Sequence, residues 1–177
     1  KKVNIKYEDI VKANETIQTT NIKGKDYAEV NQRIKAFRML YPEGFIETSL
    51  ISNENGVCVF QAVVGNGENI LGTGTAYEKE GSTFINKTSY IENCETSAVG
   101  RALGMAGFGI DTSVASAEEV QNAIANQEEK KITKEQIKTL KELLTEEKIE
   151  SMLVYYKVKS IEDMLYKDAE EVIKRKS

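Results

Sequence analysis

The sequence predicts an α+β fold: a three- to four-stranded antiparallel meander flanked by helices, followed by a small C-terminal helical bundle. Apolar residues at helical spacing over 27–40 give way to alternating and β-branched residues over 44–84, with turn signals at Asn55-Gly56 and at 65–67. Helical patterns return from residue 89 onward. Strands that follow one another closely, with helices before and after them, are typical of an α+β domain.

The first elements are predicted helices on both sides of Gly24. Residues 5–20 place apolar side chains loosely on a helical stripe, and residues 27–40 repeat them at three- and four-residue spacing. Pro42 ends the second helix, because the residue before a proline is disfavoured in helical conformation. The polar face of that helix carries Gln32, Arg33, Lys35 and Arg38.

The meander is expected to contain three clear strands. The first covers residues 45–51, the second 57–64 and the third 70–80, and the β-branched second strand is predicted to be central. Residues 82–87 form a fourth short strand or a loop. Tight turns join consecutive strands, so we expect an antiparallel sheet.

Helices follow the sheet at 89–107 and at 116–126, and Ser116 is expected to cap the second of them. We place the domain boundary in a charged hinge, 127–131, between an α+β core domain, 1–126, and a small helical domain, 132–177. In the helical domain three side chains are predicted to cap successive helices: Thr133, Ser160 and Asp168.

Composition argues against several function classes. The chain has no histidine and two cysteines, Cys58 and Cys94, which we expect to be buried free thiols. With no histidine and only two cysteines, a zinc site is not expected, and every Ser-His or Cys-His catalytic pair is missing. An enzyme of this composition would have to work with carboxylates, lysine or tyrosine. We expect instead a protein that is not an enzyme and needs neither cofactor nor metal. No apolar run approaches the roughly 18 residues of a membrane span, and the first residues lack a signal-peptide core, so a cytoplasmic location is expected.

The charge is unevenly distributed around a net value of −4. Residues 1–38 carry nine Lys or Arg against five Asp or Glu, whereas residues 39–126 carry three against eleven. The remaining residues, 127–177, carry twelve of each sign. A surface that binds nucleic acid would therefore have to be local and to draw on the N-terminal end.

The predicted helix at 89–107 is rich in small residues. Gly100 and Gly104 lie one turn apart on one face, so something must approach that face closely. Two interpretations stay open: tight packing of the helix on the sheet, or the floor of a groove for a nucleic-acid backbone or a neighbouring subunit. Arg101 either pairs with Glu92 or Glu95 or contacts a phosphate.

The segment ETSAVGRALGMAGFG, residues 95–109, resembles the helix that follows the meander in phage single-strand annealing proteins of the Erf and Sak kind. Residues 27–42 are similar to the helix before the sheet in that group, and the resemblance covers residues 24–126. It implies binding of single-stranded DNA in a groove around a homo-oligomeric ring or filament, then pairing with a complementary strand without nucleotide hydrolysis. The C-terminal helices are similar to tails that dock replication or recombination proteins.

The resemblance also implies which residues contact DNA. Basic charge would come from the predicted helix at 27–40 and from the Gly-rich helix at 89–107 with the lysine just before it, and a tyrosine would stack on a base. For each tyrosine, a place at the rim of the core is the other interpretation. The predicted contacts are Arg33, Lys35, Arg38, Tyr77, Lys87, Tyr90 and Arg101. An alternative function is a phage adaptor or inhibitor that binds a host protein through the same core and tail, since the acidic stretch 39–126 suits a basic partner.

Overall fold

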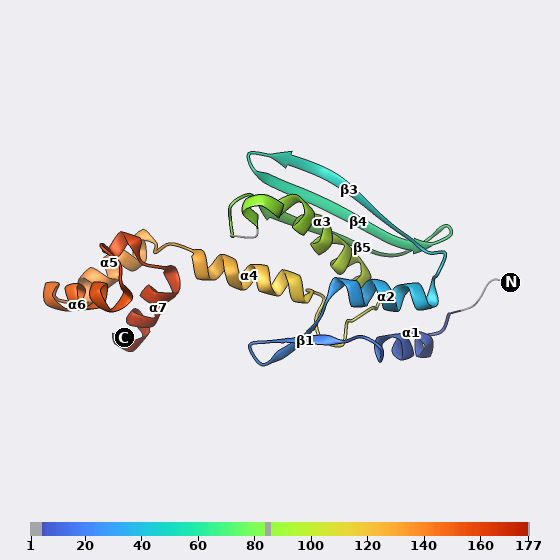
Figure 1. Ribbon diagram of the computed structural model, residues 1–177, viewed down its shortest axis with the longest axis horizontal. Helices are drawn as coiled ribbons and strands as arrows, with labels where there is room; N and C mark the ends of the chain where they lie inside the picture. The colour runs from blue at the N-terminus through green and yellow to red at the C-terminus, as the bar shows by residue number, and fades with distance from the viewer. Residues whose placement is uncertain (1–4, 84–85, 177) are drawn as a thin grey trace. The chain divides into compact units, whose positions relative to one another are not determined.

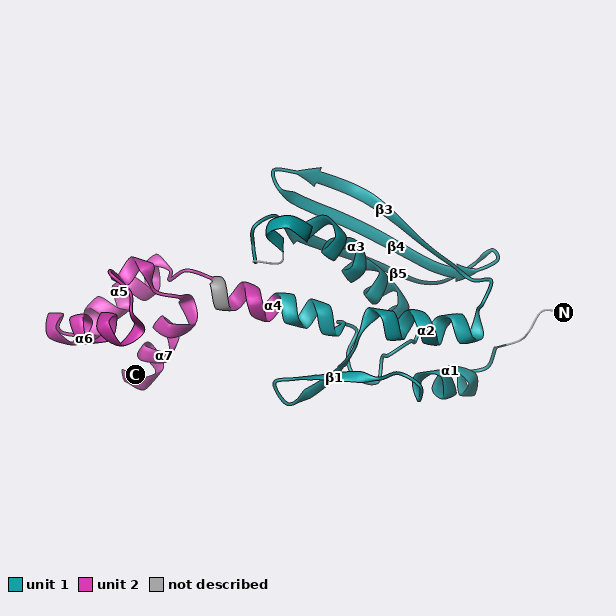
Figure 2. Ribbon diagram, in the orientation of Figure 1, with its two compact units in different colours: residues 1–122 teal, residues 123–177 magenta. Residues whose placement is uncertain are grey.

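A computed structural model describes residues 5–83 and 86–176, without the side chains of residues 128 and 129, and confirms the α+β class (Figure 1). The chain divides into two compact units, Lys1–Asn122 and Ala123–Ser177 (Figure 2). The helix α4, Ala117–Glu129, contains the point of division. The hinge at 127–131 and the domain limits drawn from it stay a prediction.

The N-terminal region contains a hairpin that the sequence analysis did not predict. The helix α1 covers Tyr7–Asn14 only, and the strands β1, Thr19–Ile22, and β2, Lys25–Ala28, pair antiparallel behind it. Lys23 and Gly24 make the turn with positive φ angles of 49° and 86°. The predicted helix at 27–40 was therefore wrong in its first turn.

The helix α2 runs from Val30 to Leu40, and Tyr41 caps it immediately before Pro42, as predicted. Its start is set by a long-range contact: the backbone N–H of Val30 donates to the carboxylate of Glu118 at 3.1 Å. An acceptor at a helix N-terminus satisfies a donor that has no partner within the helix.

Three long strands form the main sheet, in the order β3-β4-β5, and all neighbours are antiparallel. These are β3, Phe45–Glu54, β4, Val57–Asn66, and β5, Asn69–Lys79, so the prediction that the middle strand is central is confirmed. The predicted fourth strand at 82–87 is not seen in its described residues, because residues 82–83 form a bend and the helix α3 begins at Asn86. Residues 84–85 of that prediction lie outside the described residues.

The helix α3, Asn86–Met105, covers one face of this sheet (Figure 1). A Cβ atom built on Gly74 of β5 would lie 2.4 Å from the backbone nitrogen of Ala102 and 2.5 Å from the carbonyl oxygen of Ala98. The helix therefore rests directly on glycine backbone. Both cysteines are free and buried in this interface, as predicted. The core between helix and sheet is formed by Cys58, Phe60, Ala62, Val64, Cys94, Ala98 and Ala102.

Ser116 caps α4 as predicted. The N–H of Glu119 donates to the Ser116 hydroxyl at 3.3 Å, and the N–H of Ser116 donates to the Glu119 carboxylate at 3.1 Å. This reciprocal pair is a capping box. In the second unit, Thr133 and Gln136 form the same arrangement at the start of α5, Lys134–Leu143.

The second unit also contains α6, Glu146–Tyr156, the short 3-10 helix η1, Ile161–Asp163, and α7, Tyr166–Lys176. They pack around Leu140, Met152 and Met164. The predicted cap at Asp168 was wrong, because α7 begins two residues earlier and Asp168 lies within its first turn. Ser160 precedes η1, but its hydroxyl binds the Asp163 carboxylate rather than a backbone N–H. Among the described helices, none is both long and apolar enough to cross a membrane.

Candidate nucleic-acid interface

Arg33 of α2 is completely buried, contrary to the prediction that it lies on an exposed basic face. Its guanidinium donates to a set of backbone carbonyls in the segment after α3 and at one point on α3 itself. The shortest of these bonds reach Ser113 and Gly100, both at 2.6 Å, and Val114, at 2.8 Å. Longer bonds reach Gly109 and Ala115. Burial lowers the pKa of Arg33, and the charges of Glu119 and Glu118 oppose that shift. Arg33 therefore holds the 109–115 segment in place and does not face a ligand.

The two glycines of α3 face the same packing layer. A Cβ on Gly100 would lie 2.7 Å from Cγ2 of Val30, and a Cβ on Gly104 would lie 2.8 Å from Nη1 of Arg33. Side chains of α2 thus occupy the space beside both glycines. Between the two interpretations of this face, the structure supports tight packing, but against α2 rather than against the sheet; the close contact with the sheet is made through Gly74.

Arg101 forms an ion pair with Glu119 of α4 at 3.3 Å, not with Glu92 or Glu95. Its side chain is 41% exposed, whereas that of Glu119 is 17% exposed. Glu95 instead accepts a hydrogen bond from the Thr48 hydroxyl at 2.6 Å. A phosphate that approached Arg101 would therefore compete with a carboxylate that is already in contact.

Lys35 and Arg38 are the predicted cations of α2 that do lie on the surface. Arg38 donates hydrogen bonds to the carbonyls of Pro42 and Gly44, and its guanidinium lies 5.5 Å from the centre of the Phe37 ring. It therefore also ties the end of α2 to the start of β3. Lys35 makes no ion pair with another described residue.

Tyr77, Lys87 and Tyr90 belong to the other end of the sheet, near the turn between β3 and β4. Tyr90 is half-buried against the core, and its hydroxyl donates to the side chain of Asn53 at 3.1 Å. Tyr77 is 72% exposed and pairs with Val59, so it points to the sheet face that α3 does not cover. The structure therefore places the two tyrosines on opposite faces and does not gather the predicted contacts into one groove.

The uncovered face of the main sheet is a feature that the sequence analysis missed. In unit 1, no described helix packs on this face (Figure 1). On the central strand this face carries Val57, Val59, Gln61 and Val63, flanked mostly by polar side chains of β3 and β5, and Tyr77 is its exposed aromatic residue. Strand alternation alone left the buried face of β3 ambiguous, so this signal could not be read before the register was known. Its exposed polar residues include Ser49, Gln61, Thr73 and Thr75.

A groove of about 470 Å³ lies between α2, β3 and α3. Its walls include Ile34, Ile46 and Val99, and its charged groups are the carboxylates of Glu95 and Glu118. Carboxylates repel phosphate, so this groove does not suit a nucleic-acid backbone. In the described part of the chain, no cluster of three or more acidic or cysteine side chains has a geometry that could hold a metal ion.

The comparisons with known proteins point to one segment. Residues 34–106 match the model of a family described as Slr1353 N-terminal dsRNA-binding domain-like. The matched segment contains most of α2, the whole main sheet and all of α3. No curated protein and no solved structure matches the chain. The helix–sheet–helix body of unit 1 is therefore similar to a nucleic-acid-binding domain.

Proposed function

We propose that unit 1 binds single-stranded DNA and anneals complementary strands as an oligomer, without nucleotide hydrolysis. One observation carries the proposal: the match to a nucleic-acid-binding domain family and the resemblance to annealing proteins fall on the same segment. Residues 34–106 include most of the stretch 95–109 that resembles those proteins. The family match and the resemblance differ in the nucleic acid that they suggest, and both fall on the same part of the fold.

On this proposal, Lys35, Arg38 and Lys87 supply phosphate contacts from the two helices, because all three are exposed. Tyr77 offers an exposed ring on the open sheet face, where stacking on a base is sequence-tolerant and contributes about 1–3 kcal/mol per base. Arg101 would contribute when a phosphate displaces Glu119. Arg33 is not part of the contact surface.

Binding is tested with a labelled 40-nucleotide single strand, at a series of salt concentrations. Each phosphate contact contributes about 0.7 to the slope of log K against log salt for single strands. Lys35→Glu and Lys87→Glu should each weaken binding and lower that slope by about 0.7 or more. Lys134→Glu in unit 2, an equally exposed lysine, is the matched control and should leave both quantities unchanged.

Annealing is tested by mixing two complementary labelled strands with the full chain and following energy transfer between the labels. We expect faster pairing than in protein-free buffer, without added nucleotide or divalent metal, and a discrete assembly larger than one chain in light scattering. A folded monomer that binds no oligonucleotide at low salt would contradict the proposal and favour the adaptor interpretation.

Double-stranded RNA is a second candidate ligand, and the description of the matched family favours it. Proteins of that recognition type read the shape and the 2′-hydroxyls of an A-form helix. A 20-base-pair RNA duplex that binds more tightly than the single strand, and than a DNA duplex of the same sequence, would favour RNA binding over annealing.

A further inference from the structure

The second unit has an apolar groove between α6 and α7, with a volume of about 320 Å³. Its apolar walls are formed by Leu144, Met152 and Val172, together with Tyr155 and Tyr156. The groove belongs to this unit alone, which has its own core around Leu140 and Met164. It is therefore separate from the surface of unit 1 to which the proposed DNA binding is assigned.

The groove is positively charged, although the unit is not. Residues 123–177, the whole second unit, contain twelve Lys or Arg and twelve Asp or Glu. The lining of the groove, in contrast, includes Lys148, Arg175 and Lys176 and no carboxylate. Glu171 pairs with Arg175 and accepts a hydrogen bond from Tyr156 at 3.3 Å, so it neutralises part of this charge from one side. Among the described residues, no acidic side chain forms an ion pair with Lys148 or Lys176.

Tyr155 makes the aromatic wall of the groove and remains 72% exposed. Its ring packs edge-on against that of Tyr156, with 4.9 Å between the ring centres. A pair of packed rings is already ordered before any ligand arrives, so little conformational entropy is lost when an apolar side chain is inserted beside it. Exposed tyrosine with arginine nearby is a composition that is enriched at binding hot spots.

We propose that this groove binds an acidic peptide segment of a partner protein, one that inserts a large apolar side chain between α6 and α7. The apolar walls fit that side chain, and the three cations fit neighbouring Asp or Glu residues. A nucleic-acid backbone fits less well, because it has no apolar side chain to fill the walls formed by Leu144, Met152 and Val172. The inference does not depend on strand annealing, and it goes beyond the docking role that the resemblance implies for the C-terminal helices, because it names the groove and the chemistry of the segment that binds there.

The first test measures binding of a fluorescent nine-residue peptide, with four Asp followed by Leu and Phe near one end, to the full chain. Two control peptides replace either Leu and Phe by Ser, or the four Asp by Asn. We expect each control to bind at least tenfold more weakly. Equal binding of the Ser peptide would overturn the proposal, because it would show attraction by charge alone.

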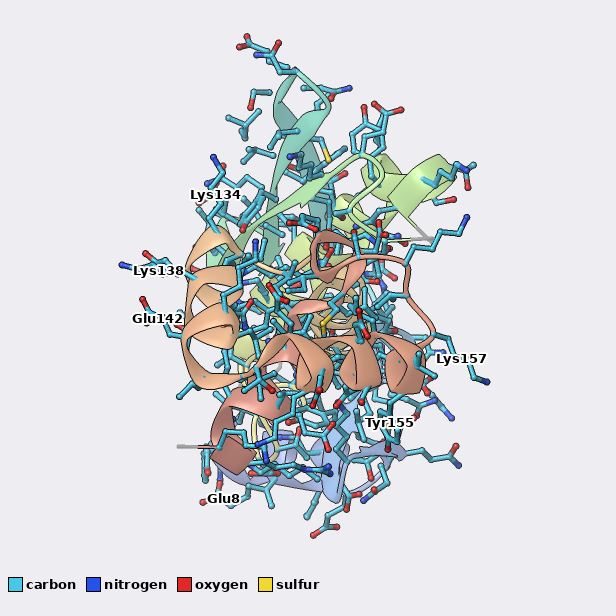
Figure 3. The ribbon with its side chains drawn as sticks, turned by 90° about the vertical axis from the view of Figure 1, so that its left-hand side faces the viewer. Glu8, Lys134, Lys138, Glu142, Tyr155 and Lys157 are labelled. Atoms are coloured by element: carbon cyan, nitrogen blue, oxygen red, sulfur yellow. The ribbon has the colours of Figure 1, made fainter. Side chains whose placement is uncertain are left out.

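The second test uses matched variants of the protein. Lys148 and Lys134 are exposed lysines in the first turns of α6 and α5, so replacement of either by Glu places a negative charge at a helix N-terminus, where it is tolerated. Figure 3 shows Lys134 along α5, away from Tyr155 on α6. Lys148→Glu should weaken peptide binding at least fivefold, and Lys134→Glu should leave it unchanged.

The aromatic wall has its own matched pair. Val154 is 78% exposed and does not line the groove, whereas its neighbour Tyr155 does. Tyr155→Ser should weaken peptide binding at least fivefold and Val154→Ser should not. Three results would overturn the proposal. The first is no peptide binding by the wild-type chain, and the second is an equal loss of peptide binding in both members of a matched pair. The third is a Lys148→Glu variant that keeps peptide binding but loses oligonucleotide binding or self-association. DNA annealing by unit 1 is measured in parallel and is expected to survive Lys148→Glu, so the two proposals can fail separately.

Discussion

Arg33 should be the charged residue of unit 1 whose loss is most damaging to stability. The change that tests this is Arg33→Met, which keeps much of the side-chain length and removes every donor. In the wild-type chain the side chain donates to carbonyls of Gly100, Gly109, Ser113, Val114 and Ala115, and it has no exposed surface. Its Nε alone lacks an acceptor among the described residues. The variant would remove this donor from all five carbonyls, of which those of Ser113, Val114 and Ala115 are part-buried.

The expected cost follows from these contacts. A hydrogen bond with a charged partner contributes about 1.5–3 kcal/mol net, and a buried polar group left without a partner costs about 1–3 kcal/mol. Such terms do not add, because all five carbonyls share one guanidinium and four of them belong to the segment after α3. Loss of one partner from a buried charged network usually costs about 3–5 kcal/mol, which is a large share of the about 5–15 kcal/mol that stabilises a domain. We therefore expect a loss of about 3–5 kcal/mol.

Urea denaturation, monitored by far-ultraviolet circular dichroism, measures this loss, and thermal unfolding should show a fall in Tm of about 12–20 °C. Lys35→Met on the exposed side of the same helix is the control, and it should change stability by less than about 0.5 kcal/mol. Arg33→Lys keeps the charge but has three donors on one nitrogen, so it should recover only part of the loss. A stability loss below about 1 kcal/mol in Arg33→Met would refute this account of the segment after α3.

Three further predictions concern the interface between α3 and the sheet. Gly74→Ala would place Cβ 2.4 Å from the α3 backbone and should cost about 2–3 kcal/mol in urea denaturation, whereas Thr75→Ala on the open face should cost much less. Burial raises the pKa of Glu78, so the folded state binds its proton more tightly than the unfolded chain; stability should therefore fall as pH rises from about 4.5, and Glu78→Gln should flatten that dependence in pH-dependent melts. Burial, with the adjacent Cys58, raises the pKa of Cys94 to about 12, so the Cys94 thiol should not react with a thiol reagent at pH 8 until denaturant is added. The Cys58 thiol is buried and out of reach of the reagent, so labelling of either cysteine in the native chain would contradict the prediction.

The main sheet could be predicted from sequence because its signals are local. Asn55 and Gly56 adopt the positive φ angles of 54° and 73° that a tight hairpin turn requires, and the β-branched strand between two turns had to be central. Ser116 and Thr133 were found for the same reason, since a capping box is complete within four residues. In each of these cases the residues that decide the structure are neighbours in the chain.

The predictions from sequence were wrong where a residue far away in the chain decides the local structure. Helical periodicity assigns Arg33 to the exposed face because its side chain is charged. Its burial is favourable only because it donates to carbonyls 67 to 82 positions away in the chain. Tyr27 fits a helical stripe, yet it pairs with Thr20 because the turn at Gly24 folds β1 back on β2. Arg101 pairs with Glu119, 18 positions away, and not with Glu92 or Glu95 of its own helix. Periodicity reports which residues share a face of an element and says nothing about what that face meets.

The burial of Arg33 changes the argument about DNA binding. Its charge belongs to the core, and Arg101 is already paired, so Lys35, Arg38 and Lys87 are the predicted cations that remain for phosphate. Three contacts give a salt slope of only about 2 for a single strand, which corresponds to weak binding by one chain at physiological salt. Side-by-side copies on one strand multiply the contacts and raise the effective concentration of each site for its ligand. On the proposed function, assembly is therefore a requirement of this charge distribution: a variant that stays monomeric should lose strand binding even though its three cations are unchanged.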